Sequence, residues 1–471
     1  MFLFKNLPFI DSFNVKSPVV RQILCVLCGT AFVCTFFSAI ATFPCAAEDA
    51  ADDADLSRLN PIEEKNDIID GSVKSGQDMA TSSPAAVPAS TREIIDQLNE
   101  LQNELNNLKE QVSGKRTRLF LNLPEKLYAL VGEELNVYFD NLVDGHDFDY
   151  DFNVDCRIGM QLERCFRVVP TEAGTYPIFI TVTDKNGNSL VRKSTIYVAD
   201  PSAGAGKERS LIIIGDSTTN NGMCVVRLNS NFAEDPMDVH TIGTRGSGKN
   251  MHEGRSGWTF KACFTVDQDP NFPDVFNPFL NPETKTFDAS YYFSKTNVAK
   301  PDWVFINLGI NDAFSFKDDE SLKKAIPEIN SRCDEMIRSI QAASPETKIG
   351  IALTIPPNYS QDAFGKAYGN GQTRKRCKRN NVIWVSNLLS RYENRENERI
   401  YVIPIHTNLD TRYNMGMEET PYNKRNPETY SSPIPNSGVH PVKEGYWQIA
   451  DVYWFFLKAF EHFSETGIPE K

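Results

Sequence analysis

The sequence predicts an α/β fold: a doubly wound, three-layer parallel sheet in the C-terminal half, preceded by a separate β-sandwich and a short coiled-coil helix. Three observations predict this architecture. From residue 209 onward, apolar segments alternate with helical stretches, as in a parallel sheet that helices cover on both faces. Residues 117–199 show the two-residue alternation of half-buried strands. Residues 92–113 carry apolar side chains in steps of four and three.

The overall composition limits the class of protein. A chain of 471 residues exceeds one ordinary core, so two or more domains are expected. With 41% hydrophobic and 24% charged residues it has the composition of a soluble globular protein. Its formal net charge of −13 argues against a nucleic-acid-binding protein, which would carry a basic surface. We therefore expect no nucleic-acid partner.

Residues 1–47 have the pattern of a signal peptide or a signal anchor. Residues 23–47 contain no charged side chain, and Lys5, Lys16 and Arg21 precede them. Small residues before Glu48 offer a cleavage site, but the apolar run is also long enough to remain as a membrane anchor. Both alternatives place the rest of the chain outside the cytoplasm, either secreted or periplasmic.

The next segments are a tether and a helix. Residues 48–91 are rich in Ala, Asp, Ser and Pro without an apolar period, which is typical of a disordered linker. In residues 92–113 the apolar positions are Ile94, Leu98, Leu101, Leu105, Leu108 and Val112. This spacing predicts a coiled coil of about three heptads, and hence a homo-oligomer. A single amphipathic helix lying on a domain is the alternative.

Residues 117–199 predict an immunoglobulin-like β-sandwich. Tyr176, Ile178, Ile180 and Val182 alternate with polar neighbours, and Asn186-Gly187 is a strong hairpin turn. The resemblance is architectural only, because the Cys–Trp–Cys pattern of immunoglobulin domains is missing. Residues 200–206, rich in Gly and Ala, predict a linker.

Residues 209–464 predict the α/β domain. Its strands are expected at 211–214, 303–308, 348–353 and 400–405, and its helices near 320–343, 374–395 and 444–463. In such folds the functional site lies at the carboxyl ends of the strands.

Six cysteines follow the targeting segment: Cys156, Cys165, Cys224, Cys263, Cys333 and Cys377. An even number in an exported chain permits disulfides, with Cys156–Cys165 and Cys224–Cys263 as the natural pairs, and six buried thiols as the alternative. No pair has metal-ligand spacing, so we expect neither a metal nor another cofactor.

Four short motifs in the α/β region carry the residue types of covalent ester hydrolysis. They are Gly215-Asp216-Ser217, Ser256-Gly257-Trp258-Thr259, Gly309-Ile310-Asn311-Asp312 and Val439-His440-Pro441. The chemistry needs a nucleophile, oxyanion donors and a base. Taken singly, each motif is also explained by a helix cap, a turn glycine, an Asx-turn or a solvated loop histidine.

In this order the motifs resemble those of the SGNH (GDSL-type) hydrolase family, over roughly the last 255 residues, whose fold is flavodoxin-like. The resemblance implies that Ser217 is the nucleophile and His440 the base. It also implies an oxyanion hole formed by the N–H groups of Ser217 and Gly257 and by the side chain of Asn311.

One position departs from the family pattern. The family usually has an aspartate three residues before the histidine, and this chain has Ser437 there. Three explanations remain open: a backbone carbonyl or Asn436 orients the imidazole, Asp410 does so, or the domain is inactive.

The combined features indicate a secreted serine esterase that removes short acyl groups, acetyl above all, from a polysaccharide or cell-envelope glycan. Its substrate would be an acylated glycan or a small ester. The alternative is a non-catalytic glycan-binding or adhesion protein with a degenerate SGNH domain.

Two further features have a functional and a structural interpretation. Trp258 and Trp303 could stack on sugars or fill the core, and the basic residues of 374–379 could meet an anionic polymer or form a solvated helix face.

Overall fold

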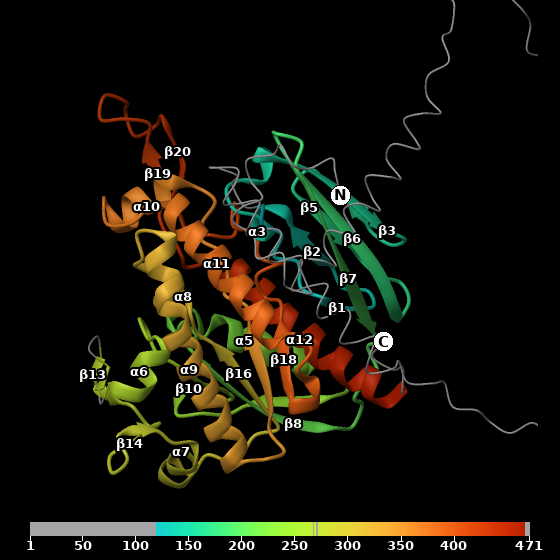
Figure 1. Ribbon diagram of the computed structural model, residues 1–471, viewed down its shortest axis with the longest axis vertical. Helices are drawn as coiled ribbons and strands as arrows, with labels where there is room; N and C mark the ends of the chain where they lie inside the picture. Colours follow the sequence, from blue (N-terminus) through green and yellow to red (C-terminus); the bar gives the residue numbers. More distant parts are fainter. Residues whose placement is uncertain (1–118, 267, 270–271, 467–471) are drawn as a thin grey trace, which may run out of the picture. The chain divides into compact units, whose positions relative to one another are not determined.

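The computed structural model describes residues 119–266, 268–269 and 272–466 (Figure 1). The predicted signal segment 1–47, linker 48–91 and coiled coil 92–113 lie outside the described residues. The elements below all belong to the unit of residues 97–471. Among the described helices, none has the length and apolarity needed to cross a membrane.

The α/β prediction is confirmed by a seven-stranded sheet in the order β10-β11-β9-β8-β16-β17-β18, parallel except for the β10–β11 pair. All four predicted strands belong to this sheet. Its strands are β8 (Glu208–Gly215), β9 (Asp238–Thr241), β10 (Arg245–Ser247), β11 (Asn250–Gly254), β16 (Trp303–Asn307), β17 (Lys348–Ala352) and β18 (Ile400–Ile403).

Helices cover both faces of this sheet, which explains why its central strands are apolar throughout. Ile212 and Ile214 of β8 belong to the core on one face, whereas Leu211 and Ile213 belong to the core on the other. The first face is covered by α6 (Phe260–Thr265), α7 (Ala289–Thr296), α9 (Asp319–Ala343) and α11 (Arg374–Tyr392). The second is covered by α5 (Met223–Ala233) and α12 (Lys443–Thr466). Burying each such aliphatic side chain stabilises the fold by about 1.5–3 kcal/mol.

Two smaller sheets precede this domain and share one hydrophobic core. The first has the order β1-β7-β6-β3 and the second β2-β5-β4. Their strands are β1 (Lys126–Leu130), β2 (Leu135–Tyr138), β3 (Tyr150–Cys156), β4 (Met160–Gln161), β5 (Cys165–Val168), β6 (Gly174–Asp184) and β7 (Ser189–Ala199). The alternating residues of β6 point into this core, and Gly187 adopts a positive φ of 76° in the β6–β7 hairpin.

The two-sheet region packs directly against the α/β domain. Asp140, in the short helix α3 (Phe139–Leu142), accepts from Arg374 Nη2 at 3.0 Å and pairs with Lys378 Nζ at 3.3 Å, and all three residues are buried. The basic residues Arg374 and Lys378 therefore neither meet solvent nor offer a surface to a polymer. In the segment predicted as a linker, Ala203 is buried, and its carbonyl accepts from Lys458 at 2.6 Å.

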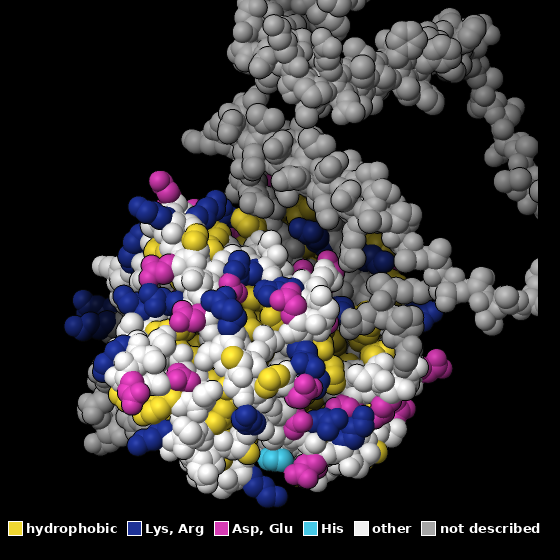
Figure 2. Space-filling view, turned by 60° about the horizontal axis from the view of Figure 1, so that its bottom comes forward, with side chains coloured by type: hydrophobic (Ala, Val, Ile, Leu, Met, Phe, Trp, Pro, Cys, Tyr) yellow, Lys and Arg dark blue, Asp and Glu magenta, His cyan; other side chains and the backbone are white. Residues whose placement is uncertain are grey.

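The remaining elements are short. They are α4 (Ser217–Asn220), α8 (Ile310–Phe314), α10 (Gln361–Tyr368), η1 (Asp147–Asp149), η2 (Glu396–Glu398), and the hairpins β12 (Gln268–Asp269) with β13 (Phe272–Phe276), β14 (Leu280–Asn281) with β15 (Thr286–Phe287), and β19 (Met417–Pro421) with β20 (Ser431–Pro435). All six cysteines outside the targeting segment are free thiols, and five of them are buried. On the face shown in Figure 2, basic and acidic side chains are interspersed.

Candidate active site

Ser217 lies in the turn that joins β8 to α4. The strand ends at Gly215, and Asp216 caps the following helix, its Oδ1 accepting from the N–H (2.9 Å) and the hydroxyl (2.8 Å) of Thr218. Asp216 is therefore a helix cap, as the sequence alternative proposed. The Ser217 side chain takes no part in this cap. Burial raises the pKa of Asp216 to about 6.

The structure brings Ser217 and His440 together across 223 residues. Ser217 Oγ and His440 Nε2 are 2.8 Å apart, which is hydrogen-bond distance. The imidazole stands in the loop before α12 and is reached by solvent, yet the protein around it disfavours the charged form and lowers the pKa of His440 below its ordinary value. A neutral imidazole beside a hydroxyl is the arrangement a general base requires.

The loop that carries His440 is held by backbone-directed contacts. Ser437 Oγ accepts from the His440 N–H at 3.1 Å, so the residue in the position of the missing acid stabilises the turn. Asn358 donates from its N–H to Gly438 O at 2.8 Å and from Nδ2 to Ser437 O at 2.9 Å. These bonds hold the backbone of the loop that carries the ring.

Neither predicted orienting side chain is hydrogen-bonded to His440. Asp410 accepts both guanidinium nitrogens of Arg164, at 2.7 and 3.3 Å, and the N–H groups of two following residues. Asn436 donates its backbone N–H to Gly416 O at 2.9 Å. Within the described part of the chain, no side chain bonds to Nδ1 of the imidazole.

The predicted oxyanion donors follow strands adjacent to β8. Gly254 at the end of β11 and Asn307 at the end of β16 both pair with Gly215, so the three carboxyl ends meet at one edge of the sheet. Gly257, just beyond β11, has a φ of +75°, a conformation that favours glycine. Asn311 Nδ2 donates to Trp258 O at 3.0 Å, which fixes the amide and leaves its second N–H available to another acceptor.

Asp312, which the sequence suggested only as the neighbour of Asn311 in an Asx-turn, has a contact of its own. Both its carboxylate oxygens accept from the Phe260 N–H, at 3.1 and 3.2 Å, so it ties α8 to the segment after Gly257. Burial, together with the charge of Asp216, raises the pKa of Asp312 to about 7. The adjacent Asn311 and Asp312 were the sequence signal for this contact, because neighbouring polar residues at the end of a strand can bond to different partners.

The two tryptophans weighed as sugar platforms are core residues. Trp258 is 3% exposed, and the guanidinium of Arg255 lies 5.0 Å from its ring centre. Trp303 is fully buried among the aromatic rings of α12. Neither ring can stack on a substrate.

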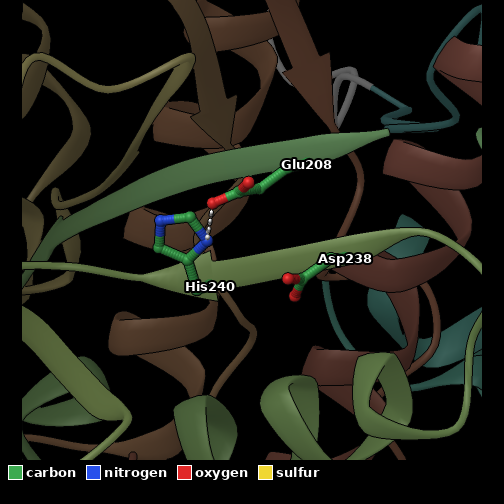
Figure 3. A group of neighbouring side chains, drawn as sticks. All are labelled: Glu208, Asp238 and His240. Carbon is green, nitrogen blue, oxygen red and sulfur yellow. Dashed lines mark ion pairs between the residues drawn. The ribbon is translucent and has the colours of Figure 1, made fainter. Parts of the chain in front are cut away.

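A group of side chains that could hold a metal ion lies elsewhere. Glu208, Asp238 and His240 bring ligand atoms within 4.8 Å of one another, and the Glu208–His240 ion pair spans 3.8 Å (Figure 3). Because β8 runs from Glu208 to Gly215, the group lies at the opposite end of the strand from Ser217, roughly 25 Å away. It takes no part in chemistry at the serine.

Residues 211–452, half of the chain, match the model of the family described as GDSL-like lipase/acylhydrolase. The solved structures that it resembles include a family 3 carbohydrate esterase from Clostridium thermocellum, 15% identical, with a TM-score of 0.31, covering 55% of this chain and 97% of that one. Another is a carbohydrate acetylesterase from Sinorhizobium meliloti, 15% identical, with a TM-score of 0.31, covering 54% and 99%. No curated protein matches the sequence.

Proposed function

This chain belongs to the family of GDSL-like lipases and acylhydrolases, and from that premise we propose that it is a Ser–His esterase that removes acetyl groups from a glycan. The observation that carries the proposal is the 2.8 Å contact between Ser217 Oγ and His440 Nε2. A hydroxyl so placed against a neutral imidazole can be deprotonated as it attacks an ester carbonyl.

In the proposed first half-reaction, Ser217 Oγ forms a bond to the carbonyl carbon while its proton moves to His440 Nε2. The carbonyl oxygen becomes an oxyanion, which accepts from the N–H groups of Ser217 and Gly257 and from the Asn311 amide. The carbon–oxygen bond to the alcohol then breaks, and the alcohol leaves with the proton from His440. Water repeats the sequence in the second half-reaction, releasing the acid and restoring the serine.

Because the orienting acid is missing, the proposed catalytic group is a dyad of Ser217 and His440. In serine proteases, loss of the orienting aspartate costs about 10⁴-fold in rate, but the remaining groups still accelerate the reaction above water. The contacts of Ser437 and Asn358 around His440 support such a dyad, because they restrict the loop without a carboxylate. We expect turnover to be slow for the family.

The preference for a short acyl group rests on the space beside the site. A recess between Gly309, Ile310 and Val439 borders the segments of Asn311 and His440 and has a free volume of about 10 Å³. That is room for about one water molecule. An acetyl methyl group suits such a recess, whereas a long acyl chain does not.

The setting of the reaction rests on the sequence alone. The apolar segment 23–47 and its preceding basic residues support an extracytoplasmic enzyme, free or anchored to a membrane. The heptad spacing of residues 92–113 supports a homo-oligomer. Both proposals concern residues outside the described part of the chain.

A fluorophosphonate probe and p-nitrophenyl acetate test the proposal on the full chain. We expect the probe to label Ser217, and Ser217→Ala to lose both labelling and ester hydrolysis while keeping the melting temperature of the wild type. Folded wild-type protein that neither labels nor turns over would refute the esterase. It would favour the alternative motivated by Ser437, a non-catalytic glycan-binding protein.

A further inference from the structure

A second, larger cleft borders the segments that follow Ser217 and His440 and is unused by the mechanism above. It encloses about 480 Å³ between the α4–α5 segment, the β10–β11 hairpin and the first turn of α12. Asn220, at the end of the helix that Ser217 begins, forms one wall, and Lys443, three residues after His440, forms another. The cleft therefore adjoins both segments that carry the proposed reacting side chains.

A buried histidine supplies a fixed donor to the cleft. His252 is 3% exposed, and its Nδ1 accepts from the Gly254 N–H at 3.0 Å. Burial, assisted by Arg245 and Arg255, lowers the pKa of His252 to about 4, so at neutral pH its single ring proton is on Nε2. That nitrogen faces Gly222 on the cleft wall, and no described residue is hydrogen-bonded to it.

The charged groups of the cleft are all cationic. Arg245 is fixed at the wall because its Nε and Nη2 donate to Asn220 Oδ1 at 3.1 and 2.9 Å. Lys443 Nζ stands 4.4 Å from the ring centre of Trp447. None of the described residues that line the cleft carries a carboxylate, although the whole chain has a net charge of −13. This combination favours an anionic ligand.

The cleft also has an apolar side. Met223 is 39% exposed and Val226 is 50% exposed, both on α5, and Trp447 lies half-buried opposite them on α12. Exposed apolar side chains in a polar cleft suit the carbon face of a sugar ring, whose hydroxyl oxygens can accept from an N–H such as His252 Nε2. The recess proposed for the acyl group has room for about one water molecule, so a sugar ring needs a larger space such as this cleft.

From these observations we infer that the cleft binds the alcohol part of the ester, and that this part is an acidic sugar unit. Its anionic substituent, a carboxylate or a phosphate, faces Lys443. Its ring lies on Met223 and Val226, and one hydroxyl accepts from His252. This inference rests on the proposed function, since it names the substrate class of the same site.

The test compares acetylated oligogalacturonides, an acetylated sugar phosphate and neutral acetylated xylo-oligosaccharides as substrates of the full chain. We expect kcat/KM to be about tenfold or more higher for one of the acidic substrates, through KM, and the preference to weaken at high salt. Which acidic substrate is preferred separates carboxylate from phosphate. In Lys443→Gln the acidic-to-neutral ratio falls about tenfold. Lys375→Gln, an exposed lysine on α11, keeps the wild-type ratio.

A binding measurement separates this inference from the proposed function. Ser217→Ala protein should bind unacetylated oligogalacturonide or sugar phosphate more tightly than neutral xylo-oligosaccharide, and Lys443→Gln added to it should remove the difference. Equal affinity for acidic and neutral sugars overturns the inference, even if wild-type protein hydrolyses small esters. Preferential acidic binding without Ser217-dependent turnover overturns the esterase and leaves the cleft assignment standing.

Discussion

Buried carboxyl groups behave in opposite ways in two regions of this molecule. Where the two-sheet region meets α11, Asp140 is surrounded by cations. Although burial acts to raise it, Lys378, His146 and Arg374 hold the pKa of Asp140 below its ordinary range. At the carboxyl edge of the large sheet, Asp216 and Asp312 accept mainly from backbone N–H groups, and no described residue forms an ion pair with either. Their pKa values rise to about 6 and about 7.

The contrast shows that burial alone does not fix the charge of a carboxyl group. In the first region ion pairs keep Asp140 charged, and the charge joins two parts of the fold. In the second region Asp312 is largely neutral at pH 6, and Asp216 is neutral for about half of the time at that pH. A neutral group costs less beside a developing oxyanion than a fixed negative charge would. The charged Asp140 therefore stabilises the contact between two parts of the fold, whereas the neutral carboxyl groups are compatible with a reaction that develops negative charge.

The largest expected effect is the loss of the base. His440→Ala should lower kcat by about 10⁴-fold or more, because Ser217 then has no group to accept its proton. Steady-state hydrolysis of p-nitrophenyl acetate measures it. His240→Ala, at the opposite end of the sheet, should retain wild-type kcat. Equal activity of His440→Ala and the wild type would show that the carboxyl edge is not the reactive region.

The contribution of the Asp140 ion pairs to stability is tested by removing one of the cations. Lys378→Met should lower the free energy of unfolding by about 3 kcal/mol, since it leaves the buried Asp140 charge with fewer partners. Urea denaturation measures it. Lys375→Met, the exposed lysine on the same helix, should change stability by less than about 0.5 kcal/mol. If both variants unfold alike, the Asp140 cluster contributes nothing to cohesion.

Much of the α/β domain could be predicted because its sequence signals are local. Apolar runs such as residues 211–214 are read directly as strands covered on both faces, and β8 lies there. The long helices α9, α11 and α12 begin within a few residues of their expected starts. The short strands β9 to β11 were not predicted, because three to five residues with polar side chains give no clear period.

The candidate site, too, could be predicted only in part from the sequence. Short motifs predicted Ser217 and His440 as nucleophile and base, and the structure places them 2.8 Å apart. The sequence could not show that Asp410 pairs with Arg164 of the two-sheet region, 246 residues away. Nor could it show that Arg374 and Lys378 are buried against Asp140, because a basic run on a helix usually faces solvent. Long-range ion pairs have no sequence pattern of their own, so these contacts appear only in three dimensions.

An oxyanion donor gives an intermediate effect within the reactive region. Asn311→Ala should lower kcat by about 10²–10³-fold with little change in KM, because the amide bonds the transition state more strongly than the substrate. Kinetics on p-nitrophenyl acetate, with the melting temperature as a control, measure the change. A rise in KM at constant kcat would instead make Asn311 a substrate-binding residue. An unchanged kcat would remove it from the oxyanion hole.

The smallest expected effect concerns the pH dependence of stability and tests the comparison most directly. Asp312 has a folded-state pKa of about 7, above the value of about 3.9 for an unfolded aspartate. Its protonated form therefore favours the folded state, so the stabilisation is complete below about pH 4 and is lost as pH rises to about 7. For Asp140 the sign is reversed: its stabilisation is present above about pH 4 and is lost as pH falls.

Asp312→Asn keeps an acceptor for the Phe260 N–H but cannot ionise. Between pH 4 and 7 the free energy of unfolding of the wild type should therefore fall relative to that of the variant, by on the order of 2 kcal/mol. Urea denaturation at several pH values measures this difference, and Glu283→Gln, an exposed carboxyl on the same domain, should follow the wild type. Parallel curves for Asp312→Asn and the wild type would mean that Asp312 ionises normally. The two regions would then differ in their partners but not in the charge of their carboxyl groups.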